Sequence, residues 1–354
     1  MGANLLNIIV TLALQSSHPD SLLSSSPVPG IAFERISDVL QYNRVQGLSF
    51  GFGYQVPMPG VRGANIYATL RYGLSDERVT GRLAMVRIAP AARLTLSAYR
   101  DIADLDPFSA GRTFSNTFNG LFAGHDNGDY ALAAGSAIRL ERSLRSGMDL
   151  VLAARVEQLS SVSRVARSAV NDFLGGTGLF PPNPPVDEGT FGGASAQLSR
   201  VGQTRWTLTA DILAGGGTAT GRVFGDVLRS LGSGLGLTVR LKAGVATAPT
   251  LSQAFFRLGG LNTIRGFEYG VLRAPAFWAA QVDITPFGGR VRPVAFLDAG
   301  QAARVSRLFS STALVGGGIG LSLFQGLIRF DLSRPISPSG SDKVRFDLMI
   351  QGAR

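Results

Sequence analysis

The sequence contains no cysteine, only two histidines and only 16% charged residues over its 354 positions. Without cysteine, neither a disulfide scaffold nor a thiolate metal site can form. The chain is too apolar for a disordered protein, and its 45 glycines follow no collagen-like period. These features predict a folded chain with a large interior, and the length allows one big domain.

Long hydrophobic runs are also missing, since none reaches the ~18–20 residues that a transmembrane helix needs. The longest run, Leu5–Leu14, has the length of a signal-peptide core, but no Lys or Arg precedes it. We therefore divide the chain into an N-terminal segment, 1–42, and a barrel domain, 43–354. The N-terminal segment is either a first strand or a degenerate signal region, and the chain is expected to begin inside a longer architecture.

Lysine is scarce, because Lys242 and Lys343 are the only two among 34 basic residues. The net charge of +10 invites a nucleic-acid interpretation. However, the arginines are scattered singly along alternating stretches, without a basic run and interleaved aromatics, so no nucleic-acid partner is expected. Arginines that face a wet barrel lumen or phosphorylated lipid headgroups fit this pattern better.

The dominant pattern is a period of two, interrupted by turns. In the stretch 47–56, apolar side chains at even positions alternate with Ser49, Gly51, Gly53 and Gln55. Fifteen such strands are predicted, and Gly30–Leu40 or the N-terminal run can supply a sixteenth, because bacterial single-chain barrels have even strand numbers. The predicted strands are 47–56, 64–72, 79–89, 91–101, 129–142, 148–160, 190–201, 203–215, 220–231, 235–248, 273–286, 291–304, 311–324, 326–336 and 343–352.

The connections between these strands alternate between short turns and long loops. The long ones span about 102–128, 161–189, 249–272, 305–310 and 336–342, and counting back from the C-terminus places them all on one side. Long loops on one rim and short turns on the other are typical of outer-membrane barrels. We therefore predict an all-β fold: a transmembrane antiparallel β-barrel of sixteen strands with a long extracellular loop folded inward. A soluble sandwich would need a linker between domains, and a solenoid would need a fixed repeat.

The sequence gives little support for a catalytic site or a metal site. The two histidines, His18 and His125, lie in predicted loops far apart in sequence. His125 belongs to the stretch HDNGDY, which lacks the spacing of a calcium loop and fits a turn that feeds a strand better. No nucleophile elbow and no P-loop is present. We expect no enzyme, no cofactor and no metal site.

One loop, Arg257–Tyr269 (RLGGLNTIRGFEY), combines glycines with Arg265, whose rigid five-donor fork needs an acidic partner. Downstream, Phe296, Asp298 and Gly300 share one face of the predicted strand 291–304. Because a carboxylate facing lipid is costly, that face should be the lumen. Asp298 is then a candidate partner for Arg265. The alternatives are a solvated loop arginine and a luminal aspartate bonded to water.

These motifs resemble the outer-membrane barrel superfamily of BamA, TamA and the two-partner-secretion transporters, a family of bacterial surface antigens. In that family a long extracellular loop carries an (V/I)-R-G-(F/Y) tip that dips into the barrel, and its arginine pairs with the aspartate of an F-x-D-x-G strand. The resemblance covers about residues 250–354. It assigns the loop tip to Arg265, Gly266 and Phe267, and the strand motif to Phe296, Asp298 and Gly300.

The sequence departs from this family in three places. There is no room for the periplasmic POTRA domains that usually precede the barrel. Asp283 lies one position away from a second acidic partner of the family, so we treat it as a further candidate contributor. The last residue, Arg354, is not the aromatic that ends many outer-membrane proteins.

The resemblance implies a protein of the Gram-negative outer membrane that acts in membrane protein assembly or protein transport. Its expected partners are outer-membrane lipid, lipopolysaccharide and an unfolded or partly folded polypeptide client, and the barrel is expected to be monomeric. The alternative is a passive barrel that serves as an anchor or pore for a missing upstream domain.

Overall fold

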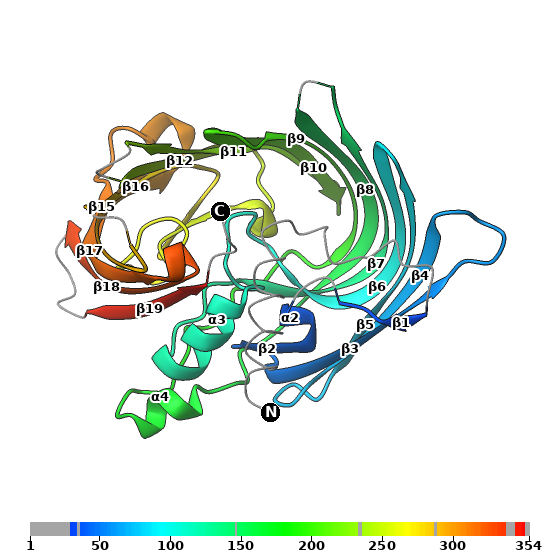
Figure 1. Cartoon of the computed structure of the whole chain (residues 1–354), viewed down its shortest axis with the longest axis horizontal. Coiled ribbons are helices and arrows are strands. Elements are labelled where there is room, and N and C mark those ends of the chain that lie inside the picture. The colour runs from blue at the N-terminus through cyan, green and yellow to red at the C-terminus, as the bar shows by residue number, and fades with distance from the viewer. Residues whose placement is uncertain are drawn as a thin grey trace.

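The alternating stretches form a single curved wall of long antiparallel strands (Figure 1). The computed structural model describes residues 29–33, 36–145, 147–232, 236–286, 289–337 and 344–350. Within these ranges sixteen strands follow one another around a barrel, as predicted. The wall strands are β2 (Leu40–Asn43), β3 (Gly47–Pro57), β4 (Ala64–Gly73), β5 (Val79–Ala89), β6 (Ala92–Asp104), β7 (Tyr130–Ser143), β8 (Met148–Ser161), β9 (Gly189–Arg200), β10 (Thr204–Gly215), β11 (Thr218–Leu231), β12 (Gly236–Ala246), β15 (Ala276–Thr285), β16 (Val291–Ala303), β17 (Leu314–Leu323), β18 (Ile328–Ser337) and β19 (Arg345–Ile350).

The sixteenth strand is β2, which begins where the predicted candidate Gly30–Leu40 ends. The earlier part of that candidate forms β1 (Gly30–Ile31), which pairs with β3 outside the sequential order, and the short helix α2 (Ile36–Val39). The expectations for residues 1–28 fall outside the described part of the chain. No helix in that described part is long and apolar enough to cross a membrane.

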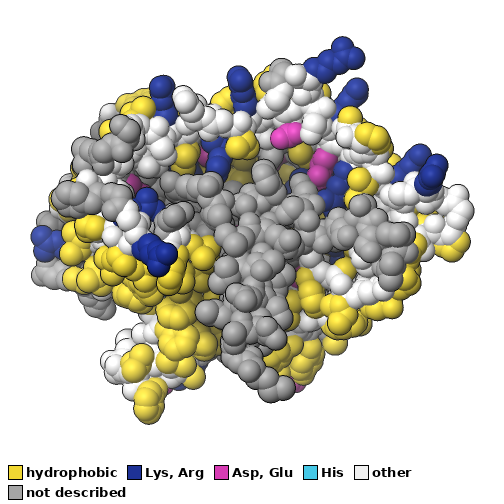
Figure 2. Space-filling model, in the orientation of Figure 1, with side chains coloured by type: hydrophobic (Ala, Val, Ile, Leu, Met, Phe, Trp, Pro, Cys, Tyr) yellow, Lys and Arg dark blue, Asp and Glu magenta, His cyan; other side chains and the backbone are white. Residues whose placement is uncertain are grey.

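The period of two separates an apolar outer face from an inner face. On β3, for example, Phe50 and Phe52 are more than half exposed, whereas Ser49 between Leu48 and Phe50 is fully buried. The same holds on β16, where Leu297 faces outward and Asp298 is buried. A space-filling view shows hydrophobic side chains gathered over β18, β19 and α4 (Ala169–Phe173) (Figure 2). This arrangement is that of a barrel wall in lipid.

Antiparallel strands place alternate connections on the same rim, so the three longest loops share one rim. The loop 105–129 holds the helix α3 (Phe114–Phe118) and the π-helical turn η1 (Asn119–Ala123), and the loop 162–188 holds α4. The loop 247–275, hereafter the inward loop, enters the barrel. It holds the 3-10 turn η2 (Ser252–Ala254) and a hairpin of β13 (Phe256–Leu258) and β14 (Leu272–Ala274). Two further 3-10 turns are η3 (Val305–Arg307) and η4 (Phe324–Gly326).

The inward loop gives the barrel an apolar core on one side of its interior. Phe256 lies between Phe224 and Phe277, with ring centroids 5.9 and 4.8 Å apart, and Phe108 lies 5.4 Å from Phe277. Tilted and edge-to-face contacts of this kind stabilise aromatic clusters beyond the area they bury. The interior next to β11–β16 is therefore packed rather than wet, which composition alone did not indicate.

Each wall strand pairs with the next along the chain, but in the described part of the chain the first and last strands are not paired with each other. Among the described residues, no main-chain ladder joins β2 to β19. Both strands contact α3 and η1 instead, and α3 lies between β19 and the strands β2 and β3 in the view down the barrel (Figure 1). We call this gap between β2 and β19 the seam.

Candidate functional site

The tip of the inward loop is a tight turn held by its own polar groups. The Thr263 hydroxyl accepts a hydrogen bond from the Gly259 amide at 2.9 Å and donates one to the Gly259 carbonyl at 2.8 Å. The Gly260 amide donates to the Phe267 carbonyl at 3.1 Å. Ile264 is fully buried behind this turn. Because the turn is closed locally, the backbone of Arg265 is presented to the barrel wall in a fixed position.

Arg265 makes a bidentate contact with Asp298 on β16. Its Nε lies 2.8 Å from Oδ2 and its Nη2 lies 2.6 Å from Oδ1 of that carboxylate, and the Arg265 amide adds a third hydrogen bond at 2.9 Å. Both side chains are almost completely buried. Parallel N–H donors matched to two carboxylate oxygens form the strongest kind of charge-assisted pair.

Two further carboxylates complete the set around this guanidinium. Nη2 of Arg265 lies 2.8 Å from Asp283 on β15, and Nη1 lies 3.3 Å from Asp331 on β18. A second arginine, Arg329, binds the same two aspartates at 2.6 and 2.7 Å. We call Arg265, Arg329, Asp283, Asp298 and Asp331 the arginine cluster.

The environment of Arg265 keeps it charged. Burial alone would lower the pKa of the guanidinium, but the carboxylates of Asp298, Asp283 and Asp331 outweigh that effect and raise the pKa above its ordinary value. The guanidinium also lies over the Phe296 ring, 3.8 Å from its centroid, which adds a cation–π contact. With two arginines and three aspartates, the cluster is nearly neutral, which is what allows these charges to be buried.

Gly266 lets the loop tip lie directly on the wall. Its φ is +92°, which side chains with a Cβ rarely adopt, and a Cβ there would lie 2.5 Å from the backbone of Arg334 on β18. On β17, Gly316 faces the Arg265 carbonyl in the same way, next to a register shift between Val315 and Gly316. Two glycines, one in the inward loop and one on β17, thus leave no side chain that would hold the loop away from the wall.

The structure brings most of the residues predicted for the site together. Arg265 contacts both Asp298 and Asp283, and Phe296 lies beneath the guanidinium. Phe267 joins the apolar core instead of the arginine cluster. Gly300 lies on β16 under Ile264, where a Cβ would come within 2.9 Å of the Ile264 side chain.

Sequence reasoning missed Arg329 and Asp331. They occupy alternate positions of β18, so they share one face with Ser333, and a carboxylate on a wall strand must point inward. The argument that placed Asp298 in the lumen would have placed Asp331 there as well. Only the tilt and register of the strands show that it reaches the same arginine.

A second group of buried ion pairs ties the long loops together. Arg44, in the turn after β2, lies 3.2 Å from Asp126 through its Nε. Its Nη1 donates to the carbonyl of Pro182 in the loop 162–188 at 3.2 Å. Asp129 accepts hydrogen bonds from Arg257 and Arg273 at 3.0 and 3.2 Å. The carboxylates of the HDNGDY stretch are thus bound by arginines from other loops. In the described ranges, no group of three or more His, Cys, Asp or Glu is arranged to hold a metal ion.

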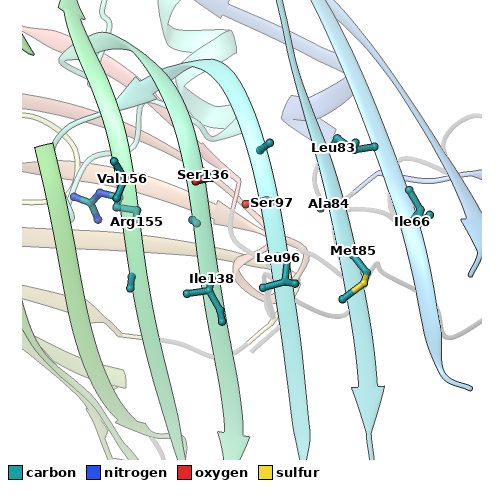
Figure 3. A pocket seen from close by; sticks show the side chains of 13 residues that line it. Ile66, Leu83, Ala84, Met85, Leu96, Ser97, Ser136, Ile138, Arg155 and Val156 are labelled. Atoms are coloured by element: carbon teal, nitrogen blue, oxygen red, sulfur yellow. The ribbon is translucent and has the colours of Figure 1, made fainter. Parts of the chain in front are cut away.

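One surface depression lies on the outer wall and is unrelated to the arginine cluster. It is a shallow groove of about 610 Å³ over β4–β8, bounded by Leu83, Leu96, Ile138 and Val156 (Figure 3). Arg155 belongs to the opposite face, where it binds Glu157 at 2.6 Å. The groove is apolar and faces lipid, so it offers no group for chemistry.

Comparison with known proteins supports the fold and no more. No protein-family model and no curated protein sequence matches the chain. Among solved structures, the chain resembles BamA from Haemophilus ducreyi lacking POTRA domains 1–3, with a TM-score of 0.58 at 13% identity, covering 87% of this chain and 68% of that one. Two further matches are CdiB from Acinetobacter baumannii, at 12% identity over 87% of this chain and 56% of that one, and CdiB from Escherichia coli, at 13% identity over 87% and 60%. Both have a TM-score of 0.47. The chain therefore has the fold of a BamA-like outer-membrane β-barrel, as its loop and strand motifs predicted.

Proposed function

We propose that this chain is the membrane-embedded barrel of a protein that inserts or translocates polypeptides at the bacterial outer membrane. The observation that carries the proposal is the seam. Every neighbouring pair of wall strands from β2 to β19 shares a ladder, whereas the described residues show none between β2 and β19 themselves. An unpaired strand edge is costly in lipid and is a template for another strand. The seam is thus where the wall can part with the smallest loss of main-chain hydrogen bonds.

The arginine cluster has a positioning role in this proposal. Arg265 links the inward loop to β15, β16 and β18, the strands that lead up to the seam. Because the pair with Asp298 is buried and bidentate, it holds the loop only while both partners remain. The cluster would keep this part of the wall rigid when the edges of β2 and β19 separate.

The partners proposed for the chain follow from this role. They are an unfolded or partly folded polypeptide inside, and outer-membrane lipid and lipopolysaccharide around the apolar wall. We propose that the barrel acts as a monomer, without a cofactor and without catalysing a reaction.

Insertion of a client barrel into proteoliposomes tests the proposal. A urea-denatured outer-membrane barrel protein is diluted onto liposomes that hold this chain, and its heat-resistant folded form is followed on gels. We expect faster folding than on empty liposomes, and a loss of that acceleration with Arg265→Ala. If the chain conducts ions in planar bilayers but never accelerates folding, the passive pore or anchor is the correct function.

A further inference from the structure

We infer that residues 113–123, hereafter the seam segment, are the resident occupant of the β19 edge and must leave it before a polypeptide strand can pair there. The segment comprises Thr113, α3 and η1 of the loop 105–129. This inference rests on the proposed function, because it names what controls the seam that the function uses.

The seam segment satisfies the β19 edge as a neighbouring strand would. The Asn119 carboxamide accepts a hydrogen bond from the Leu348 amide at 2.7 Å and donates one to the Leu348 carbonyl at 3.0 Å. Two residues along, the Ile350 amide donates to Ser115 Oγ at 2.8 Å. In an antiparallel pair, alternate residues turn both backbone groups to the same neighbour. Asn119 therefore reproduces, with one side chain, the two-bond pair that a strand residue would make.

On the other side of the seam, the same segment and its approach bind β2. The Tyr42 amide donates to Thr117 Oγ1 at 3.2 Å, and Gln41 Nε2 donates to the Gly111 carbonyl at 3.0 Å. The segment thus lies between the two edges, with three side-chain hydrogen bonds to the main chain of β19 and one to the main chain of β2.

The composition of the segment fits a temporary part of the wall. Ser115, Thr117 and Asn119, which bind the strand edges, are buried, whereas Phe118 and Phe122 stack with centroids 4.5 Å apart and remain partly exposed. The segment therefore has aromatic side chains on its outer side and polar side chains on its inner side, as the barrel wall does. A helix cannot continue a ladder, so each bond to the edges comes from a side chain.

An extended strand can make more hydrogen bonds to the β19 edge than the segment does. The segment contributes three side-chain hydrogen bonds to β19. A paired strand offers its main chain along the whole edge, as β18 does over the six residue pairs that it shares with β19. When the segment leaves, its polar side chains can bond to water, which keeps the net loss small. The β19 edge would then be free for an incoming strand.

The experiment uses the absence of cysteine in the natural chain. Ser115→Cys with Ile350→Cys locks the segment to β19 on treatment with a short bifunctional thiosulfonate, and reductant releases it. The matched control is Ser230→Cys with Thr238→Cys, whose hydroxyls lie 3.3 Å apart across β11 and β12, far from the seam in the strand order. The probe is a synthetic peptide with the sequence 47–57 of β3, which carries a photoactivatable benzophenone.

We expect the locked seam pair to abolish photo-cross-linking of the peptide to β19, reductant to restore it, and the control pair to leave it unchanged. Asn119→Ala should raise cross-linking about 25-fold, because it removes both hydrogen bonds to Leu348 and each contributes about fivefold. Cross-linking that persists in the locked protein would overturn the inference. Equal cross-linking of the peptide to the wild type and to Asn119→Ala would also overturn the inference.

The peptide assay needs no client, so it separates the two claims. If the lock blocks the peptide while the wild type never accelerates client folding, the proposed function fails and the inference stands. If client folding is accelerated and the lock leaves both assays unchanged, the inference fails and the function stands.

Discussion

Replacement of Arg265 by alanine should destabilise the barrel through the carboxylate that it leaves behind. Asp298 has no exposed side-chain surface, and Arg265 is the cation that binds it in the described structure. Breaking a buried ion pair by removing one partner costs about 3–5 kcal/mol, mainly because the remaining charge stays buried. Asp283 and Asp331 lose one cation but keep Arg329. We therefore assign most of the cost to Asp298.

Urea unfolding in detergent, followed by tryptophan fluorescence, measures this free energy, and heat-resistant migration on gels gives an independent check. Arg273→Ala is the matched control, because Arg273 lies in the same loop, is partly exposed, and shares Asp129 with Arg257. Its loss should cost below about 1 kcal/mol, because Arg273 is partly exposed and Asp129 keeps Arg257 as a buried cation.

The double variant decides whether the pairing is real. Arg265→Ala with Asp298→Ala removes one charge of each sign and leaves Arg329 with two aspartates. It should therefore be little less stable than either single variant, and Asp298→Ala alone should also lower the fraction of folded barrel. If the two single effects simply add, the two residues act independently and the reasoning is refuted.

Three more predictions concern the loops. Gly266→Ala should release the inward loop and increase its proteolysis, because the new Cβ would collide with the β18 backbone. The control is Gly216→Ala, where φ is +59° but no atom lies near the new Cβ. It tests backbone strain alone and should have the smaller effect. Arg44→Ala should lower the free energy of unfolding in urea by about 3 kcal/mol, because Asp126 stays buried without its cation. Arg44→Lys should recover only part of that free energy, since lysine lacks the forked donors of a guanidinium. Full recovery with lysine would contradict this. Burial raises the pKa of Asp106, so the folded state binds its proton more tightly than the unfolded state. The stability of the wild type relative to Asp106→Asn should then grow as the pH falls and shrink as it rises through the folded-state pKa, and a difference independent of pH in urea titrations would disprove it.

The wall of the barrel was predictable because its signal is local. The alternation along 47–56 is visible from neighbouring residues alone. The structure confirms this strand as β3, Gly47–Pro57. The pairing of Arg265 with Asp298 was within reach for a related reason, since parity placed the carboxylate in the lumen. The participation of Asp331 depends on strand tilt, which no local pattern contains.

The seam segment could not be located from its sequence. The stretch TFSNTFNGLFAG mixes glycine, asparagine and aromatic residues, which is typical of a loop. Thr113 does cap α3, and its side chain accepts a hydrogen bond from the Asn116 amide at 3.2 Å, so the helix start carried a readable signal. The place of the helix between β2 and β19 follows from contacts more than 200 residues apart in sequence, such as that of Asn119 with Leu348.

The arginine cluster also constrains the order in which the barrel can assemble. The carboxylates that neutralise Arg265 come from β15, β16 and β18, and the last of these lies near the end of the chain. Until β18 is in place, the loop tip has neither its full set of counter-charges nor the backbone on which Gly266 rests. Docking of the inward loop therefore follows the placement of β15, β16 and β18, and a docked loop reports that these strands are in position.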